Sequence, residues 1–104
     1  MCSRFSILSN SRTFIEHFAL PDAGHYITSF NVTPATNIPI IRCNQDTKNR
    51  ELVNCHWGLI PHWLRENIKN KPVNARAETL TDKPYFRDAF RKRRCLIPAN
   101  GFYE

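Results

Sequence analysis

The second residue of the chain, Cys2, is the first candidate for chemistry. Removal of Met1 leaves one residue that carries both a free α-amino group and a thiol. The ordinary pKa values of these groups are about 7.7–8.0 and 8.5, so each has a nucleophilic fraction near neutral pH. The amine can condense with an aldehyde to an imine, and the thiol can then close a thiazolidine ring. The alternative is an ordinary small hydrophobic residue near a terminus.

The other metal-ligating residue types show no site-like spacing. The remaining cysteines, Cys43, Cys55 and Cys95, are scattered without a C-x-x-C pair, and the four histidines are not paired either. A zinc site would need ligands converging from distant strands. We therefore expect no metal and no cofactor. In a reducing compartment the three later cysteines are expected to be inert thiols without a disulfide.

Composition indicates a single globular domain spanning 1–104. Hydrophobic residues make up 41% of the chain and aromatic residues 12%, which excludes a disordered chain. No apolar run approaches the roughly 18 residues of a membrane span, and a signal-peptide core is absent. We expect a cytoplasmic protein, associated with the nucleoid if the source is bacterial. The net charge of +6 suits nucleic acid, although a merely basic protein fits the charge equally well.

Short strands and helices should position these residues. Thr13 and Glu16 match a T-x-x-E capping box, with Phe14 and Phe18 on one face of the helix that follows. Pro39 argues that its strand is an edge strand or begins there. The pattern predicts an α+β fold with mostly antiparallel strands, forming a sheet or partial barrel. The expected strands are 3–8, 26–30, 38–43, 51–57 and 94–97, a hairpin connection covers 44–50, and the expected helices are 13–20 and 83–92.

Three residues between these elements have more than one interpretation. Trp57 and Trp63 flank a Gly/Pro loop in a basic protein and could form a stacking platform for bases. Burial is the alternative for both, and it is preferred for Trp57, which ends a strand. Asn74 lies in an apolar context near Arg76, where it could orient a ligand or form part of a turn. A loop is expected over 30–36, and Thr81 or Asp82 is expected to cap the second helix.

Five segments together carry a resemblance to a known family. They resemble, in order and spacing, the successive signatures of the SRAP family, the SOS-response-associated peptidase domains. The match covers the whole chain and about the first half of a family domain. The segments are Met1–Phe5, Phe30–Pro34, Trp57–Pro61, Asn74–Thr79 and Arg94–Glu104.

The resemblance implies covalent crosslinking to abasic sites in single-stranded DNA. The ring-opened sugar presents an aldehyde, and the processed Cys2 is its nucleophile. By the same resemblance Asn74 positions the sugar and Glu104 shuttles protons, a role that a carboxylate within hydrogen-bond reach can perform. An amide can fix the aldehyde without titrating.

The resemblance also implies a set of DNA contacts. Arg4, Asn31 and Arg76 match positions that face the DNA backbone, and arginine forms charge-assisted bonds to phosphate. Ordinary surface salt bridging is the alternative for the two arginines. Pro34 and Trp63, or its neighbour Leu64, are implied to be an apolar wedge for the flanking bases.

The chain departs from the family pattern at two points. Ser3 stands where the family has glycine, which constrains the backbone there. The family also has a crosslinking-site histidine in its second half, which this sequence does not reach. A half-length domain has unpaired strand edges, so we expect a homodimer or a marginally stable fragment. The other functions considered are a thiol autopeptidase and a non-catalytic module that binds single-stranded DNA.

Overall fold

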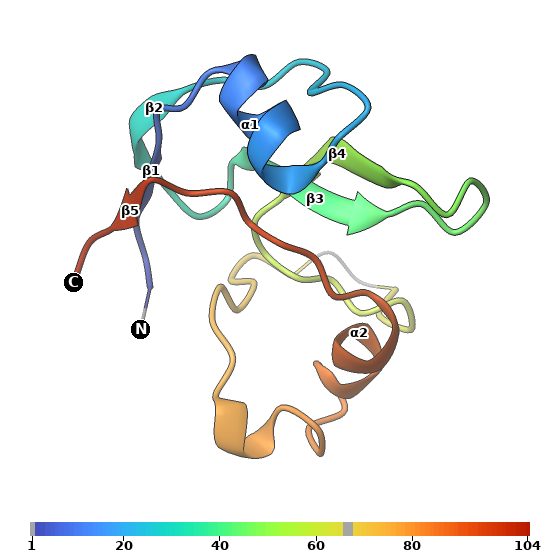
Figure 1. The fold of residues 1–104 in the computed structure, drawn as a ribbon. Helices are drawn as coiled ribbons and strands as arrows, with labels where there is room; N and C mark the ends of the chain where they lie inside the picture. Colours follow the sequence, from blue (N-terminus) through green and yellow to red (C-terminus); the bar gives the residue numbers. More distant parts are fainter. Residues whose placement is uncertain (1, 66–67) are drawn as a thin grey trace.

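The computed structural model describes residues 2–65 and 68–104, with five strands and two α-helices in the order shown in Figure 1. The described part measures 38 × 35 × 26 Å. Its antiparallel strands and short helices confirm the predicted α+β class. The elements are β1 (Phe5–Ile7), α1 (Ser11–Phe18), β2 (Ser29–Val32), β3 (Asn37–Cys43), β4 (Arg50–His56), a 3₁₀ turn (Ala77–Thr79), α2 (Arg87–Lys92) and β5 (Gly101–Phe102).

One sheet joins segments that are far apart in sequence. Its order is β2-β1-β5, and both pairings are antiparallel. Phe5 at the start of β1 lies opposite Val32 of β2 and opposite Phe102 of β5. The first strand of the chain is therefore the central strand, and its two neighbours come from residues about 30 and 100 positions along. In Figure 1 the segment before β1 and the segment after β5 leave this sheet on the same side.

The second sheet is the predicted hairpin. β3 and β4 pair from Asn37 opposite His56 to Cys43 opposite Arg50. The connection is closed by Asn44, whose side-chain oxygen accepts the backbone N–H groups of Asp46 and Thr47 at 2.8 and 3.0 Å. Such an Asx turn is what asparagine favours at the start of a connection.

Pro39 lies where a strand tolerates proline. The N–H and carbonyl of Ile41 both bond to Leu96, at 2.8 and 2.9 Å, so these groups point away from β4. Because backbone groups alternate in direction along a strand, the missing N–H of Pro39, two residues earlier, also falls on this outer side. The proline removes no bond to β4, in agreement with the predicted edge position.

The predicted helix at 13–20 exists but begins earlier. Its N-cap is Asn10, whose side chain accepts the N–H of Thr13 at 2.9 Å, so the predicted Thr13 cap is wrong. Asparagine caps at least as well as threonine, and Glu16 bonds to Arg12 at 3.1 Å instead of returning to the cap. The helix ends at Phe18, and its C-cap Ala19 has the left-handed conformation with φ of 54°.

Three other predicted elements are displaced or shorter. The strand expected at 26–30 forms at Ser29–Val32, because β1 pairs with these residues, and the loop expected at 30–36 is therefore partly strand. Of the strand expected at 94–97, only Leu96 pairs, with Ile41. The second helix is regular only over Arg87–Lys92, and its N-cap is Phe86 rather than Thr81 or Asp82.

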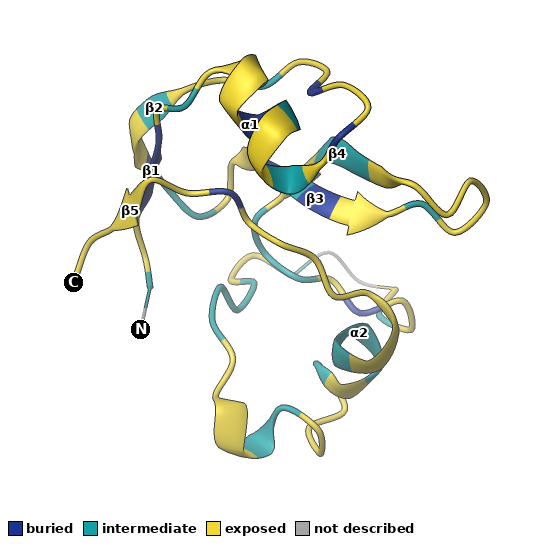
Figure 2. Cartoon of the chain, viewed as in Figure 1, coloured by how far each residue is buried: buried dark blue, intermediate teal, exposed yellow. Residues whose placement is uncertain are grey.

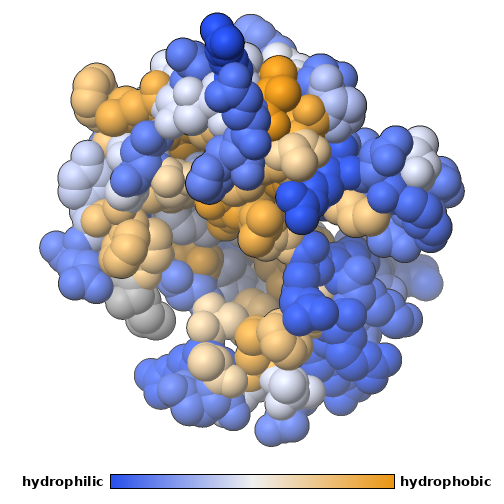
Figure 3. All heavy atoms as spheres, in the orientation of Figure 1, coloured by the Kyte–Doolittle hydropathy of each residue, from blue (hydrophilic) through white to orange (hydrophobic). Residues whose placement is uncertain are grey.

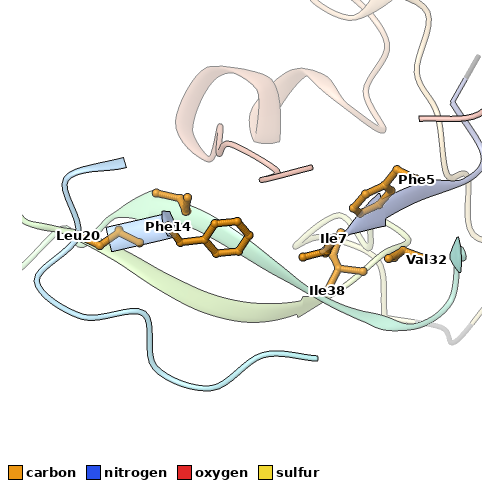
Figure 4. Close-up of a cluster of buried hydrophobic side chains, with 7 residues drawn as sticks. Phe5, Ile7, Phe14, Leu20, Val32 and Ile38 are labelled. Carbon is orange, nitrogen blue, oxygen red and sulfur yellow. The ribbon is translucent and has the colours of Figure 1, made fainter. Parts of the chain in front are cut away.

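The core lies between the β1 sheet, α1 and the hairpin. Phe14 of α1 stacks on Tyr26 with ring centroids 4.8 Å apart, and Phe5 packs on Trp57 at 5.4 Å. Figure 2 shows buried residues in this part of the molecule, and Figure 4 shows their side chains in the cluster. The buried cluster consists of Phe5, Ile7, Phe14, Leu20, Val32, Ile38 and Ile41.

Candidate functional site

Cys2 lies at one end of the central strand. Its side chain is half-buried and packs against the core, and its thiol donates to the carbonyl of Arg4 at a sulfur–oxygen distance of 3.7 Å. Three residues later the backbone enters β1, between β2 and β5. The segment that carries the nucleophile is thus held against the sheet. Met1, whose removal the aminothiol chemistry requires, lies outside the described residues.

Arg4 and Asn31 are brought together by the pairing of β1 with β2. A guanidinium Nη of Arg4 donates to the side-chain oxygen of Asn31 at 3.2 Å, and both residues are exposed. The Arg4 carbonyl also accepts the N–H of Tyr103 at 3.0 Å. The bond to Asn31 takes one of the five guanidinium donors. The arrangement therefore presents an oriented cation beside Cys2 with donors left to bind an anion.

Glu104 is brought to the same end of the sheet by β5. Phe5 lies opposite Phe102, and the bond from Tyr103 to Arg4 continues this register by one residue. Glu104 follows Tyr103 directly, and Ser3, the neighbour of Cys2, precedes Arg4 directly. The hydroxyl of Tyr103 donates to the carbonyl of Phe30 at 2.8 Å, which ties this end of β5 to β2.

Trp57 connects three segments around this site. Its ring packs on Phe5, its indole N–H donates to the carbonyl of Val73 at 3.0 Å, and its backbone exchanges bonds with the turn at 35–36. Asn74 follows Val73 directly and is half-buried, and Pro34, also half-buried, belongs to the same turn. The indole bond therefore links the Asn74 segment to the ring that packs on the first residue of β1.

The sequence interpretation missed the role of Trp57 in linking the Asn74 segment to the first sheet. Trp57 is half-buried, not fully buried as preferred, and a tryptophan N–H in such a place needs an acceptor. The need for an acceptor could have indicated that the Trp57 indole bonds to another segment. Gly58 contributes next to it: its φ is 147°, and a Cβ there would lie 3.3 Å from the Cβ of Lys71. Any side chain at this position would be strained and crowded.

Trp63 and Arg76 belong to a different part of the molecule. Trp63 is 48% exposed, and its ring meets the ring of Tyr85 edge-on at 6.3 Å. The Tyr85 hydroxyl in turn donates to the carbonyl of Leu59 at 2.7 Å. Arg76 is exposed just before the 3₁₀ turn, where its carbonyl accepts the N–H of Thr79. Among the described residues, the ring pair of Trp63 and the backbone bond of Arg76 join them to Tyr85 and Thr79, not to Cys2.

Among the described residues there is neither a metal-binding cluster nor a membrane-spanning helix. Within 2–65 and 68–104, no group of three His, Cys, Asp or Glu side chains is arranged to hold a metal ion. The helices in the same ranges are all too short or too polar to cross a membrane. All four cysteines are free thiols.

Comparisons with known proteins identify close relatives. The chain is 46% identical to the abasic site processing protein YoqW of Bacillus subtilis, with all of this chain and 47% of that protein covered. It is 33% identical to the abasic site processing protein HMCES of Xenopus tropicalis, over 80% of this chain and 28% of that protein. The chain therefore spans about half the length of its bacterial relatives.

A solved structure and a family model extend the comparison to the fold. A crystal structure of a protein from Bordetella bronchiseptica matches 99% of this chain and 50% of its own, with a TM-score of 0.80 and 29% identity. The model of the family described as SOS response associated peptidase (SRAP) matches residues 1–104. The fold, the relatives and the matched residues agree, and the chain belongs to the SRAP family.

Proposed function

We propose that this chain processes abasic sites in DNA by crosslinking to them through Cys2. The observation that carries the proposal is the grouping at one end of the first sheet: a half-buried thiol at Cys2, the Arg4–Asn31 pair, and the bond from Tyr103, the neighbour of Glu104, to Arg4. These residues come from three distant stretches of the chain. The names of the relatives, abasic site processing proteins, supply the substrate class.

The proposed chemistry balances without a cofactor. After Met1 is removed, the Cys2 amine adds to the aldehyde carbon of the ring-opened sugar, and the resulting hydroxyl leaves as water to give an imine. The thiol sulfur then bonds to the same carbon, and its proton goes to the imine nitrogen. Aldehyde and aminothiol thus give a thiazolidine and one water. Glu104 accepts the proton from the amine and returns it to the departing hydroxyl.

The remaining residues bind and orient the strand in this proposal. Arg4 and Arg76 bond to backbone phosphates, because guanidinium groups form charge-assisted and often bidentate bonds to them. Asn31 holds Arg4 in position at 3.2 Å. Asn74 orients the sugar, and Pro34 and Trp63 contact the flanking bases. A single strand is the proposed substrate because bases must be unstacked to lie against aromatic side chains.

The crosslink is tested on a denaturing gel. Protein with Met1 removed is incubated with a fluorescent single strand bearing one abasic site, and a heat-stable shifted band is expected. Cys2→Ala should abolish the band, whereas Cys43→Ala, which alters an exposed thiol on β3, should leave it unchanged. A band that survives Cys2→Ala would contradict the proposal. Glu104→Gln should slow the reaction by about 10²- to 10⁴-fold, the usual range for a general acid–base group.

A second candidate function is non-catalytic binding of single-stranded DNA. It is favoured by the net charge of +6, which suits a polyanionic strand whether or not a crosslink forms. Binding of the undamaged strand without any adduct, under conditions where both Met1 removal and the abasic site are verified, would select it. Cleavage of a peptide substrate that is lost in Cys2→Ala would instead select the thiol peptidase that the family description names.

We also propose that the chain pairs with a second copy along β5. In the described sheet β5 is an edge strand, and Phe102 lies opposite Phe5. Residues opposite each other share a face of the sheet, yet Phe5 is 4% exposed and Phe102 is 65% exposed. The apolar sheet face that is covered at Phe5 is therefore exposed at Phe102 on the edge strand. An exposed apolar edge strand tends to pair with another strand. Sedimentation over a dilution series should reveal a dimer that Phe102→Glu dissociates, and a wild-type monomer at all concentrations would contradict it.

A further inference from the structure

A basic hollow lies away from the Cys2 end of the molecule. It has a volume of about 490 Å³ and is enclosed by β3, the hairpin connection, β4 and the segment that follows α2. In Figure 3 hydrophilic residues gather over this side, above the hairpin and α2. Its charged residues are the cations Arg42, Lys92, Arg93 and Arg94 and the anions Asp46 and Glu51.

The carboxylate of Glu51 is already engaged within the hollow. It accepts the Nδ2 group of Asn44 at 3.0 Å and the Nε group of Arg42 at 2.8 Å. These two bonds hold the pKa of Glu51 below its ordinary value. Arg42 and Glu51 therefore form a neutral pair at working pH. Three cations remain against Asp46, so the hollow carries a net positive charge.

The dipole of α2 explains only part of the positive charge of the hollow. A helix dipole favours cations in the last helical turn, which explains Lys92 at the end of α2. Arg94 lies beyond the helix, and its guanidinium carbon is held 5.6 Å from the centre of the Phe90 ring. An arginine stacked in this way keeps its N–H fork directed outward for an anion.

The thiol of Cys95 adds no negative charge to the hollow. Cys55 and Cys95 both line it, and desolvation, with a smaller contribution from Cys55, raises the pKa of the Cys95 thiol. A raised pKa keeps this thiol neutral at physiological pH. The positive charge of the arginines is therefore the main electrostatic feature of the hollow, and its ligand should be anionic.

β3 runs from the contact with Trp57, whose ring packs on Phe5, toward the hollow. β3 begins at Asn37, next to the contact of Thr36 with Trp57, and ends at Cys43, which lines the hollow. Seven residues at about 3.3 Å per residue span roughly 20 Å. A strand that contacts both the Trp57 end of β3 and the hollow must therefore be several nucleotides long.

We propose that this hollow binds the phosphodiester backbone of single-stranded nucleic acid several nucleotides from the reacting sugar. The location relative to the sugar rests on the proposed function, whereas binding of the backbone does not. Arg93 and Arg94 bind the phosphates, and the neutral Arg42–Glu51 pair forms the floor. The hollow thereby lengthens the contact with DNA without taking part in the reaction at Cys2.

The test compares two double variants of equal charge change. Arg93→Gln/Arg94→Gln removes two cations of the hollow, and Arg12→Gln/Lys83→Gln removes two exposed cations elsewhere. Affinity for an undamaged 15-nucleotide strand is measured by fluorescence anisotropy over a range of salt concentrations. The hollow variant should bind on the order of tenfold more weakly than the control. Its salt slope should fall by about 1.4, since each phosphate contact on a single strand contributes about 0.7.

A second measurement separates this contact from the crosslinking site. Crosslink yield is compared on a 4-nucleotide abasic strand and on 15-nucleotide strands extended to the 5′ or the 3′ side. The hollow variant should match the control on the short strand and lose the rate advantage of one extended strand. Arg93→Lys/Arg94→Lys, which keeps the charge, should retain the salt slope.

Two outcomes would overturn the inference. One is equal affinity and equal salt slope in the hollow variant and the control. The other is an equal loss on short and long strands, which would place the effect at Cys2 or in folding. If no protein forms a crosslink, the proposed function fails, while the anisotropy measurement still decides whether the hollow binds the backbone.

Discussion

The two parts of this chain differ in how firmly they are held. The first comprises the two sheets and α1, and it contains the entire seven-residue buried cluster. The second is the connection 58–95, in which Pro61 alone is buried among the described residues. The radius of gyration, 14.5 Å, exceeds the roughly 13 Å expected for a compact domain of this length. Figure 2 shows the contrast between the two parts.

The difference bears on how the proposed site is built. Asn31 belongs to β2 of the packed part, and Cys2, Arg4 and Glu104 belong to the segments directly next to β1 and β5. Trp63 and Arg76 belong to the open part, where few buried contacts fix their position. Segments with few buried contacts are the ones that rearrange on binding. In the proposed function the packed part therefore positions the reacting groups, and the open part adapts to the strand.

The largest effect should come from the core of the packed part. Ile7, only 1% exposed, loses most of its packing in Ile7→Ala, which should lower the free energy of unfolding by about 2–5 kcal/mol. Phe86→Ala in the open part, where Phe86 is half-buried, should have a clearly smaller effect. Urea titration of both variants measures this. Equal losses would show that the two parts share one core.

Trp57, which bonds the two parts to each other, should show the next largest effect on stability. Trp57→Phe keeps a ring against Phe5 but removes the N–H that bonds to the Val73 carbonyl at 3.0 Å. We expect a loss of about 1–2 kcal/mol in the free energy of unfolding, since the acceptor loses its partner. The crosslink yield should also fall, because the Asn74 segment is released. Trp63→Phe is the matched control and should leave stability unchanged. An equal loss in both variants would contradict the proposed role of the Trp57 bond between the two parts.

The helices extend the contrast to secondary structure. Asn10 caps α1 with a side-chain bond of 2.9 Å to Thr13, whereas α2 has no side-chain cap. Asn10→Ala should therefore destabilise the protein by about 1 kcal/mol. Loss of α1 should appear at a lower urea concentration by circular dichroism. Ser11→Ala, one residue later, supplies no such bond and serves as the control; a similar loss in both would contradict the assignment of the cap.

The sequence predicted the packed part better than the open part, for local reasons. The hairpin was predictable because Asn44 and the polar connection set its turn, and Pro39 marked its outer side. The helix cap was misplaced because Asn10 and Thr13 are both good caps three residues apart. The displaced β2 and the missing strand at 94–97 depend on partners far along the chain, which local pattern does not encode.

The features of the candidate site also depend on contacts between distant parts of the chain. Strand order brings Cys2, Arg4, Asn31 and Glu104 to one end of a sheet, and only the family resemblance pointed to such a grouping in the sequence. The indole bond of Trp57 was not predicted, since nothing local indicates that its acceptor is the carbonyl of Val73. The basic hollow could not be predicted without the bridge between Ile41 and Leu96, which brings the end of α2 near the hairpin.

The smallest effect should come from the hairpin charges that border both parts. Bonds from Asn44 first, and then from Arg42, lower the pKa of Glu51 in the folded chain. The unfolded chain therefore binds more protons near pH 4, so this contribution to stability is present above the ordinary pKa of about 4.3 and is lost as the pH falls through the lowered value. Glu51→Gln should flatten the dependence of the melting temperature on pH between about 2 and 5. Glu16→Gln, on the exposed face of α1, is the control. An unchanged slope in Glu51→Gln would mean that these bonds do not persist in solution, and the floor proposed for the basic hollow would then be a charged, mobile surface instead of a neutral pair.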